Sequence, residues 1–528
     1  MARCFTVGFS LSVSMSKHSS VVFSSAIQPI WILCIAMAVS LSACRKDSQQ
    51  ISVPVAVTQP DPLYQDQWYL NGNGGRQTIY LTQNQYTGKG VLIALVDNGI
   101  DINHEDLKEN IVPGSYSYLP VEYDFAEADH GTACAGIIVA KAGNGKGIRG
   151  IAPDAKMVAF NAQRTPEIGF LADALQRNKE KIWISSNSWG DFNSWGEPMP
   201  LRPAIQEALE KGTTYGRNGK GIVYVFSSGN GNTVSGANLP TDNVNYSGLV
   251  NNRYTIPVGA VDEKGKHASY SEVGATLLVC APSKANGGMG IVTTDATGRK
   301  GYNPLVFQGD YADSLHNYTK YFSGTSASAP MVTGVVALML EANPSLSWRD
   351  VKAILAYSAS MCDVRDSDWF QNGAGLWVNH QYGFGIVNAD RAIWMSKGWH
   401  PFSTEKMVSK EQSVDRDIPD NDAQGLTSQL VLDENVDVEF IDVYVDAPTH
   451  TRLGDLEIVL ISPQGTTSVL AEYHTELFSG AFRYHNWRFG TMRCLGEGSK
   501  GVWKLTIKDK KQGAIGALRS WKVIAYGH

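Results

Sequence analysis

The side chains best suited to catalysis in this chain of 528 residues lie in three short segments that are far apart in the sequence. The first segment carries Asp97, the second His130 and the third Ser326. A serine hydroxyl is a weak nucleophile, so it needs a base that takes its proton and an acid that orients the base. The three residue types in this order therefore predict an Asp–His–Ser triad in which Ser326 attacks a carbonyl carbon.

Ser326 lies in the segment 322–330, FSGTSASAP, directly before an apolar run that reaches Leu340. Gly324 permits a tight approach of the chain, and a helix beginning here would present unpaired N–H groups and its positive dipole end to the hydroxyl. We expect Pro330 in the first turn of this helix, where proline is tolerated. A helix start built from small residues would also explain the segment taken alone, and the other two segments decide against that interpretation.

The elements that must position these residues follow from the apolar pattern. The run from Val91 to Val96 is typical of a buried parallel strand, which would deliver Asp97 to the C-terminal edge of a sheet. His130 opens an apolar, small-residue helix, HGTACAG, in which we expect Cys134 to be a buried, unpaired thiol. Strands are expected at 90–96, 157–161, 183–186, 222–227 and 254–258, and helices at 130–140, 169–181, 203–212 and 348–359. This alternation predicts an α/β fold, a parallel sheet with helices on both faces.

The strings VDNGIDINHEDL, HGTACAG, SNSWG, SSGNG and GTSASAP resemble those of subtilisin-like serine endopeptidases, nearer to the kexin and furin branch than to subtilisin itself. The order of the triad agrees with this clan. The resemblance implies that the amide of Asn230 donates to the oxyanion of a tetrahedral intermediate, a contribution of roughly 3–4 kcal/mol. It also implies that Ser188, Trp189 and Gly190 form an edge that binds an extended substrate.

The primary specificity pocket is where the resemblance weakens. Enzymes of the kexin branch line this pocket with carboxylates, because a buried guanidinium needs a fixed acidic partner. The corresponding positions here hold Asn193 and Ser247, with Asp191 and Asp242 as the acidic residues nearby. If neither aspartate compensates, we expect a broad preference in place of cleavage after arginine alone. Glu127 is a candidate for binding a basic residue in the next subsite.

A second group of residues matches a structural calcium site of the kexin family. Asp61, Asp106 and Asn144 would supply oxygen ligands from an N-terminal arm, from the loop after Asp97 and from the glycine-rich loop 142–147. Such ligands suit Ca²⁺, which also accepts backbone carbonyls. A bound ion would tie down the N-terminal arm and stabilise the fold. The alternative interpretation is three solvated loop residues.

The N-terminus has the features of a targeting segment. Basic residues precede the apolar stretch 27–39, which is too short to span a bilayer comfortably. The following LSAC resembles a bacterial lipoprotein signal, in which Cys44 is lipidated; the alternative is an ordinary secretory signal. We therefore expect a signal segment at 1–44, a polar tether at 45–60, and a protein that is secreted or held on the surface of a bacterial membrane in the cell envelope.

The pattern changes after the catalytic domain, which we expect at 61–400. A polar stretch predicts a linker at 401–424, and short alternating strands predict an all-β jelly-roll sandwich at 425–528. Its strings ISPQG, GVW and LRSW resemble those of the P-domain that accompanies kexin-type proteases, which implies a stabilising partner of the catalytic domain. A carbohydrate-binding or protein-binding module is the alternative. Strands are expected at 436–445, 456–462, 468–472, 501–508 and 520–525.

Net charge supports no nucleic-acid partner, because a chain with a formal charge of −6 has no basic excess. We expect a calcium-stabilised, membrane-tethered serine endopeptidase that acts on protein or peptide substrates, with some preference for basic residues if the pocket permits it. A catalytically silent peptide-binding or adhesion module on the same fold is the alternative. The presence of all four catalytic candidates argues against that alternative.

Overall fold

The structure is a computed structural model, and it describes residues 60–82, 85–119, 128–162, 167–190, 196–233, 239–285, 287–298, 300–303, 316–476 and 482–528. Four residues singled out above lie outside these ranges: Cys44, Glu127, Asp191 and Asn193. The signal segment and the tether up to Gln59 also lie outside them. Residues Val57–His528 form one compact unit, which contains both an α/β domain and a C-terminal sandwich.

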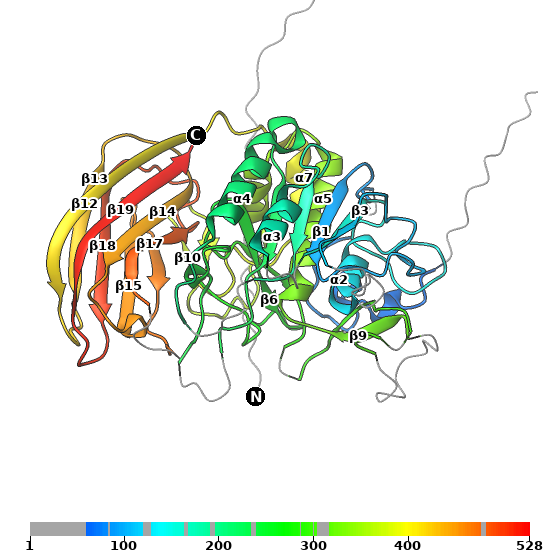
Figure 1. Ribbon diagram of the computed structural model, residues 1–528, viewed down its shortest axis with the longest axis horizontal. Helices are drawn as coiled ribbons and strands as arrows, with labels where there is room; N and C mark the ends of the chain where they lie inside the picture. Colours follow the sequence, from blue (N-terminus) through cyan, green and yellow to red (C-terminus); the bar gives the residue numbers. More distant parts are fainter. Residues whose placement is uncertain are drawn as a thin grey trace, which may run out of the picture. The chain divides into compact units, whose positions relative to one another are not determined.

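The α/β domain is built on a seven-stranded sheet with the strand order β2-β3-β1-β4-β5-β6-β7 (Figure 1). Every neighbouring pair in this sheet is parallel. The strands are β1 (Leu92–Asp97), β2 (Tyr116–Ser117), β3 (Lys156–Asn161), β4 (Ile184–Asn187), β5 (Val223–Ser227), β6 (Thr255–Val261) and β7 (Val279–Pro282). The prediction of a parallel sheet is confirmed, and its five expected strands correspond to β1, β3, β4, β5 and β6.

Helices cover both faces of the sheet (Figure 1), because alternate strand residues point to opposite faces. In β1, Ile93 and Leu95 belong to the core that contains α2 and α5, whereas Ala94 and Val96 belong to the core that contains α3 and α4. The helices are α1 (Trp68–Asn71), α2 (Asp129–Val139), α3 (Ile168–Gln176), α4 (Pro203–Tyr215), α5 (Thr325–Ala342), α6 (Trp348–Ser358) and α7 (Ala389–Gly398). Helices on both faces were predicted, and this is confirmed.

Helix α5 is the central element of one face, since it contacts β4, β5, β6 and β7. Its 18 residues are apolar enough to cross a membrane, and within the described residues it is the one helix with that property. It is, however, 89% buried inside the fold. We therefore interpret α5 as the core helix of a globular domain.

Short pairs of strands complete the domain: β8 (Ile291–Thr294) with β9 (Tyr318–Phe322), and β10 (Phe370–Gln371) with β11 (Trp377–Val378).

The C-terminal part is a β-sandwich of two four-stranded antiparallel sheets, with the orders β12-β19-β14-β17 and β13-β18-β15-β16. Its strands are β12 (Lys406–Ile418), β13 (Leu426–Leu432), β14 (Val438–Ala447), β15 (Leu456–Ile461), β16 (Thr467–Ala471), β17 (Tyr484–Thr491), β18 (Gly501–Asp509) and β19 (Gly516–Gly527). Trp503, Trp521 and Phe489 are buried in its core. The predicted sandwich is confirmed, although β13 and β17 were not among the expected strands.

The linker predicted at 401–424 is wrong over most of its length. Residues Lys406–Ile418 form β12, which pairs with β19 along one side of the sandwich. Most side chains of β12 are exposed and polar, including Lys406, Lys410 and Glu411. A strand at the edge of a sheet often carries such residues, which discourage pairing with other chains. Its composition therefore resembles that of a solvated linker.

Candidate active site

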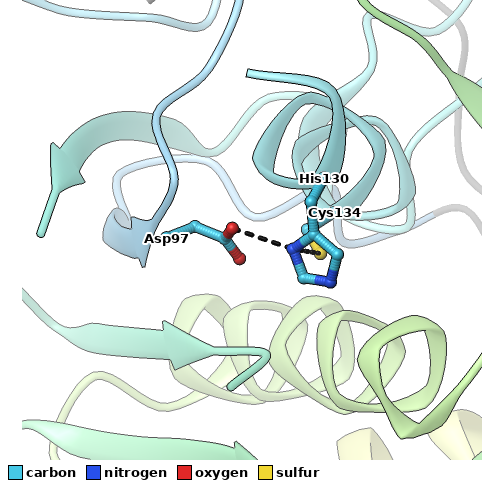
Figure 2. Close-up of side chains that lie close together, drawn as sticks. All are labelled: Asp97, His130 and Cys134. Carbon is cyan, nitrogen blue, oxygen red and sulfur yellow. Dashed lines mark hydrogen bonds and ion pairs between the residues drawn. The ribbon is translucent and has the colours of Figure 1, made fainter. Parts of the chain in front are cut away.

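The strand β1 and the helix α2 bring Asp97 and His130 together (Figure 2). The fully buried carboxylate of Asp97 lies with Oδ1 2.8 Å from Nδ1 of His130. The helix approaches the strand closely because the residue after His130 is glycine. An added Cβ at Gly131 would lie 1.8 Å from the carbonyl oxygen of Gly99. A side chain at position 131 would therefore push the imidazole away from the carboxylate.

The charge of Asp97 controls the protonation of His130. Burial of the imidazole lowers its pKa, but the charge of Asp97 and its hydrogen bond outweigh this, and the pKa of His130 is raised well above 6.5. The bond to Asp97 leaves Nδ1–H as the donor, so Nε2 is the nitrogen that can accept a proton. This arrangement suits a general base that becomes a stabilised imidazolium.

Cys134 lies one helical turn after His130, with its Sγ 4.0 Å from Nδ1 of His130 (Figure 2). Burial raises the pKa of its thiol, which therefore stays protonated near neutral pH. The expectation of a buried, unpaired thiol is confirmed. Asp97, His130 and Cys134 are close enough together to hold a metal ion. However, Nδ1 of His130 cannot bind a metal while it donates to Asp97.

Ser326 lies in the first turn of α5, directly after the turn that Gly324 makes with φ = +80°. This φ is in the left-handed region, which favours glycine. The hydroxyl of Ser326 donates to the carbonyl oxygen of Ser188 at 3.3 Å. Among the described residues, Ser326 Oγ makes this hydrogen bond and none to Nε2 of His130. Catalytic hydrogen bonds are often loose before substrate binds.

Pro330 lies in the second turn of α5, so its predicted place in the first turn is wrong. Proline has no N–H, and the carbonyl that loses its helical partner is that of Ser326. Two side chains outside α5 donate to this carbonyl oxygen: Ser188 Oγ at 3.1 Å and Cys134 Sγ at 3.6 Å. The helix therefore continues through Pro330 because other elements satisfy the Ser326 carbonyl. This also ties the nucleophile's backbone to β4 and α2.

The amide of Asn230 is oriented by the residue before the nucleophile. Its Oδ1 accepts from the backbone N–H of Thr325 at 2.9 Å and from the hydroxyl of Thr325 at 3.0 Å. Both bonds use the oxygen, so the NH₂ group is the part of the amide that can donate to a substrate. Gly324 passes close by: an added Cβ there would lie 3.5 Å from Nδ2. Asn230 thus lies beside the start of α5, as expected.

A pocket lies beside the Asn230 amide. Gly229, the residue before Asn230, lines this pocket, and its carbonyl oxygen accepts from the Thr325 hydroxyl at 3.3 Å. Its lining includes the substrate-binding candidates Gly190 and Ser247. It also includes three carboxylates, Glu197, Asp242 and Glu272, each less than a tenth exposed. The complete lining is Gly190, Glu197, Met199, Ser227, Ser228, Gly229, Asp242, Tyr246, Ser247, Val250 and Glu272.

This lining bears on the expectation of a broad preference before the cleaved bond. That expectation required that neither aspartate compensate for Asn193 and Ser247, and the structure has Asp242 in the pocket wall. Glu197 and Glu272 were missed, because they lie far apart in the sequence and in no recognisable motif. Glu272 reaches the pocket by accepting from the backbone N–H of Gly231 at 3.1 Å. Only the folded chain brings these acids together.

Trp189, which follows β4, and Asn98, which follows β1, contact other parts of the fold and do not line the pocket. The indole N–H of Trp189 donates to the carbonyl of Val96 at 2.8 Å, so its side chain lies in the core. Trp189 can therefore offer a substrate only its backbone. Asn98 donates to the Asp129 carboxylate at 3.0 Å and accepts from Gly131 N–H at 3.0 Å, which joins β1 to α2.

The three calcium candidates also lie together. Asn144 donates to Oδ1 of Asp106 at 2.7 Å, and the backbone N–H of Gly143 donates to Oδ1 of Asp61 at 2.8 Å. Burial raises the pKa of Asp106 to about 7, and the nearby charge of Asp61 adds to this effect. Burial and the charge of Asp61 make the ionised form of Asp106 costly, and a nearby cation relieves this cost. The donor set therefore fits Ca²⁺.

Comparison with known proteins agrees with this geometry. Residues 88–385 match the model of the subtilase family, and residues 438–525 match the model of the proprotein convertase P-domain. The chain is 34% identical to human proprotein convertase subtilisin/kexin type 6 over 514 residues, covering 92% of this chain and 50% of that protein. It is 32% identical to kexin of Saccharomyces cerevisiae over 491 residues, covering 88% of this chain and 56% of kexin.

Among solved structures, a serine protease of Aeromonas sobria is similar, with a TM-score of 0.78 and 25% sequence identity. That similarity covers 89% of this chain and 96% of the other. The chain spans about half the length of the two curated relatives named above. The family match nevertheless covers more than half of the chain and contains every described catalytic candidate. This chain therefore belongs to the subtilase family.

Proposed function

We propose that this protein is a serine endopeptidase of the subtilisin and kexin type. The observation that carries the proposal is the 2.8 Å contact between the buried Asp97 and His130, next to a helix that begins at the nucleophile candidate Ser326. Intact catalytic candidates also argue against the silent peptide-binding alternative. The match to the subtilase family supports the same reaction.

The chemistry follows from the roles that each group can take. His130 Nε2 accepts the proton of Ser326 Oγ while Oγ bonds to the carbonyl carbon of the substrate. The carbonyl oxygen becomes an oxyanion, to which the Asn230 amide donates. The imidazolium then gives its proton to the leaving amine as the C–N bond breaks, leaving an acyl-enzyme. Water, deprotonated by His130, attacks this ester, and the imidazolium returns the proton to Ser326 Oγ as the ester C–O bond breaks and the acid leaves.

The acidic pocket supports a preference for basic side chains before the cleaved bond. A guanidinium or ammonium group that enters a buried pocket loses water and needs fixed carboxylates in return. Glu197, Asp242 and Glu272 offer these groups in the pocket beside Asn230. We therefore replace the expectation of a broad preference with a preference for arginine or lysine. The second subsite, to which Glu127 was assigned, stays a prediction.

The calcium proposal rests on Asp61, Asp106 and Asn144. Ca²⁺ would be held by the two carboxylates, by the Asn144 amide oxygen after rotation of the side chain, and by backbone carbonyls of the loop 142–147. When bound, the ion supplies charge compensation and a link between three segments of chain. It has no part in peptide hydrolysis. Binding to the folded state alone would raise the free energy of unfolding.

The proposed location rests on the sequence of the N-terminal segment. The apolar stretch 27–39 and the LSAC motif support lipidation of Cys44 and attachment to a bacterial membrane surface. A Cys44→Ser variant should move from the membrane fraction to the soluble fraction of cells that express the full chain. Equal distribution of the variant and the wild type would contradict a lipid anchor at Cys44.

Peptide hydrolysis by the purified chain tests the reaction and the preference together. Peptides that differ only in arginine or leucine before the cleaved bond should differ in kcat/KM by at least tenfold, in favour of arginine. Asp242→Asn should reduce that ratio, and Ser326→Ala should abolish cleavage of both peptides. Cleavage that persists in the Ser326→Ala protein would overturn the assignment of the nucleophile. Equal ratios in wild type and Asp242→Asn would overturn the pocket assignment.

A further inference from the structure

The proposed specificity pocket is formed partly by two loops with little regular structure of their own. One loop carries Glu197 and Met199, and the other carries Asp242 and Ser247. The loops touch where the backbone N–H of Met199 donates to the carbonyl of Tyr246 at 2.7 Å. A short 3-10 turn, Val244–Tyr246, is the regular element in the second loop. Their positions must therefore depend on neighbouring elements.

The neighbouring element is the segment directly after β16 of the sandwich. The imidazole of His474 is 3% exposed, and its Nε2 lies 2.7 Å from the carbonyl oxygen of Gly196, next to Glu197. The same ring lies against the Tyr246 ring of the second loop, with centroids 4.7 Å apart. Nδ1 of His474 lies 3.1 Å from the Tyr246 hydroxyl. One side chain of the sandwich thus contacts both acidic loops.

Backbone and side-chain bonds on either side of His474 hold the loop that carries Asp242, and the loop that carries Glu197 packs closely on the ring. The N–H of Thr475 donates to the carbonyl of Pro240 at 2.9 Å, two residues before Asp242. The amide of Asn243 donates to the Glu472 carboxylate at 2.8 Å. The contact at Gly196 is close: a Cβ there would lie 2.6 Å from Cδ2 of His474, at a residue with φ = +71°. No side chain fits between this loop and the imidazole.

We propose that His474 is a positioning residue for the specificity pocket, which fixes the spacing between the loops that carry Glu197 and Asp242. This inference rests on the proposed function, because it assumes that the pocket binds the side chain before the cleaved bond. A carboxylate stabilises a buried guanidinium only when it is fixed within hydrogen-bond reach. A displacement of about 1 Å can cost two orders of magnitude in rate. The sandwich therefore contributes to substrate choice as well as to stability.

The ring nitrogens explain why histidine suits this position. Nε2 faces the carbonyl oxygen of Gly196, and Nδ1 faces the carbonyl oxygen of Glu472 at 2.7 Å. Carbonyl oxygens only accept, and a neutral imidazole has one N–H, so the ring donates to one of these two carbonyls. Glutamine can also donate, through its side-chain NH₂ group, whereas alanine cannot donate. The variants His474→Gln and His474→Ala therefore form a graded series.

The test compares this series with a matched variant elsewhere in the interface between the two domains. Asn372 donates to the carbonyls of Arg493 and Leu495 at 2.9 and 3.0 Å, is buried like His474, and lines no part of the pocket. Each full-length variant is assayed on a peptide library that varies the residue before the cleaved bond. His474→Ala should raise KM for the preferred residue and reduce its advantage over leucine at least tenfold, while kcat for leucine changes less than twofold. His474→Gln should lose less, and Asn372→Ala should keep the wild-type profile.

A probe that needs no catalysis separates failure of this inference from failure of the proposed function. Benzamidine, a small amidinium compound, is titrated into full-length proteins that carry Ser326→Ala. Weaker binding in both Asp242→Asn and His474→Ala supports the inference. Weaker binding in Asp242→Asn alone overturns it and leaves the proposed pocket intact. If the protein with Ser326→Ala alone does not bind benzamidine, the acidic-pocket assignment fails, and the inference that assumes this pocket fails with it.

Discussion

At the scale of single residues, a buried carboxylate sets the charge state of the candidate base. Asp97 is fully buried, and its Oδ2 has no hydrogen-bond partner among the described residues. Its Oδ1 contacts Nδ1 of His130 and accepts from the backbone N–H of Asn98 at 2.7 Å, and its charge raises the pKa of His130 well above 6.5. This electrostatic coupling predicts both a pH profile and the effect of removing the charge.

The first prediction concerns pH. His130 must be neutral to accept a proton from Ser326, so kcat/KM should fall as the pH drops through the pKa of His130, at a pH above 6.5. Asp97→Asn should lower kcat by about four orders of magnitude and move this limb to lower pH, because the imidazolium loses its partner. Steady-state rates from pH 5 to 9 measure both effects. An unchanged limb in Asp97→Asn would contradict the coupling.

The second prediction concerns the oxyanion. Asn230→Ala should lower kcat by about two to three orders of magnitude with little change in KM, since the amide acts in the transition state. Asn232→Ala is the matched control, because Asn232 lies two residues away and its amide donates to the Ser269 carbonyl at 3.1 Å. A change confined to KM would instead assign Asn230 to ground-state binding.

Sequence reasoning found the residues that local motifs mark and missed those that only folding brings together. Asp97 ends a strand, and His130 and Ser326 each lie in the first turn of a helix, all within distinctive local patterns. Glu197 and Glu272 carry no such pattern, and they reach the pocket through long-range contacts. Trp189 shows a different limit of sequence reasoning. Its motif is recognisable, but the direction of its side chain depends on packing against Phe226, which the motif does not reveal.

At the scale of elements, the pattern of apolar residues predicted the buried strands well and the exposed ones poorly. Strands such as β1 and β5 are buried on both faces, so their sequences are continuous apolar runs. β12 has mostly exposed side chains, and hydrogen bonding to β19 holds it along the sandwich. Pro330 was misplaced for a similar reason, since its tolerance depends on donors from Ser188 and Cys134.

The third prediction concerns the calcium site, which would link the N-terminal arm to two loops. Chelation should lower the thermal midpoint of Ser326→Ala protein, the background that prevents self-cleavage, because binding at 100 times Kd adds about 2.7 kcal/mol. Adding Asp106→Asn should remove most of this shift. Asp154→Asn is the control: Asp154 pairs with Lys141 at 2.6 Å, outside the proposed site. Equal chelator shifts in all three proteins would exclude Asp106 as a ligand.

At the scale of the whole molecule, a cluster of charges joins the catalytic domain to the sandwich. Arg349 donates to the Glu439 carboxylate, with Nε 2.7 Å from Oε2, and Arg253 pairs with Glu405. Lys352 is buried among these groups, where its Nζ donates to the carbonyl of Arg253 at 2.7 Å. Burying this many charged groups couples the stability of the interface to pH.

The fourth prediction uses Lys352, whose pKa burial lowers to about 7, with Arg253 acting in the same direction and Glu439 and Asp442 opposing. The unfolded chain keeps an ordinary lysine pKa near 10.5, so it binds more protons than the folded protein between pH 7 and 10.5. Stability from this group therefore rises with pH across that window. Lys352→Met should lack this rise. The difference in free energy of unfolding, Lys352→Met minus the parent Ser326→Ala protein, should therefore fall by a few kcal/mol from pH 7 to 10.

Denaturant unfolding of both proteins at each pH measures this difference. A constant difference across the window would show that Lys352 keeps the same charge state in the folded and unfolded chains.

Truncation after Trp399 gives a separate test of the same interface. It should leave an insoluble or unstable catalytic domain, because apolar interface residues such as Phe440 and Met492 would no longer cover the α/β core. A soluble fragment of equal stability would favour a binding role for the sandwich.

The central claim is that Ser326 is a nucleophile activated by His130. A fluorophosphonate reacts covalently with such a hydroxyl, and mass spectrometry of the digested protein identifies the modified residue. We predict stoichiometric modification of Ser326 in the wild type, strongly slowed modification in His130→Ala, and none in Ser326→Ala, with all three proteins folded. Modification of another residue, or equal labelling of the wild type and His130→Ala, would contradict the claim.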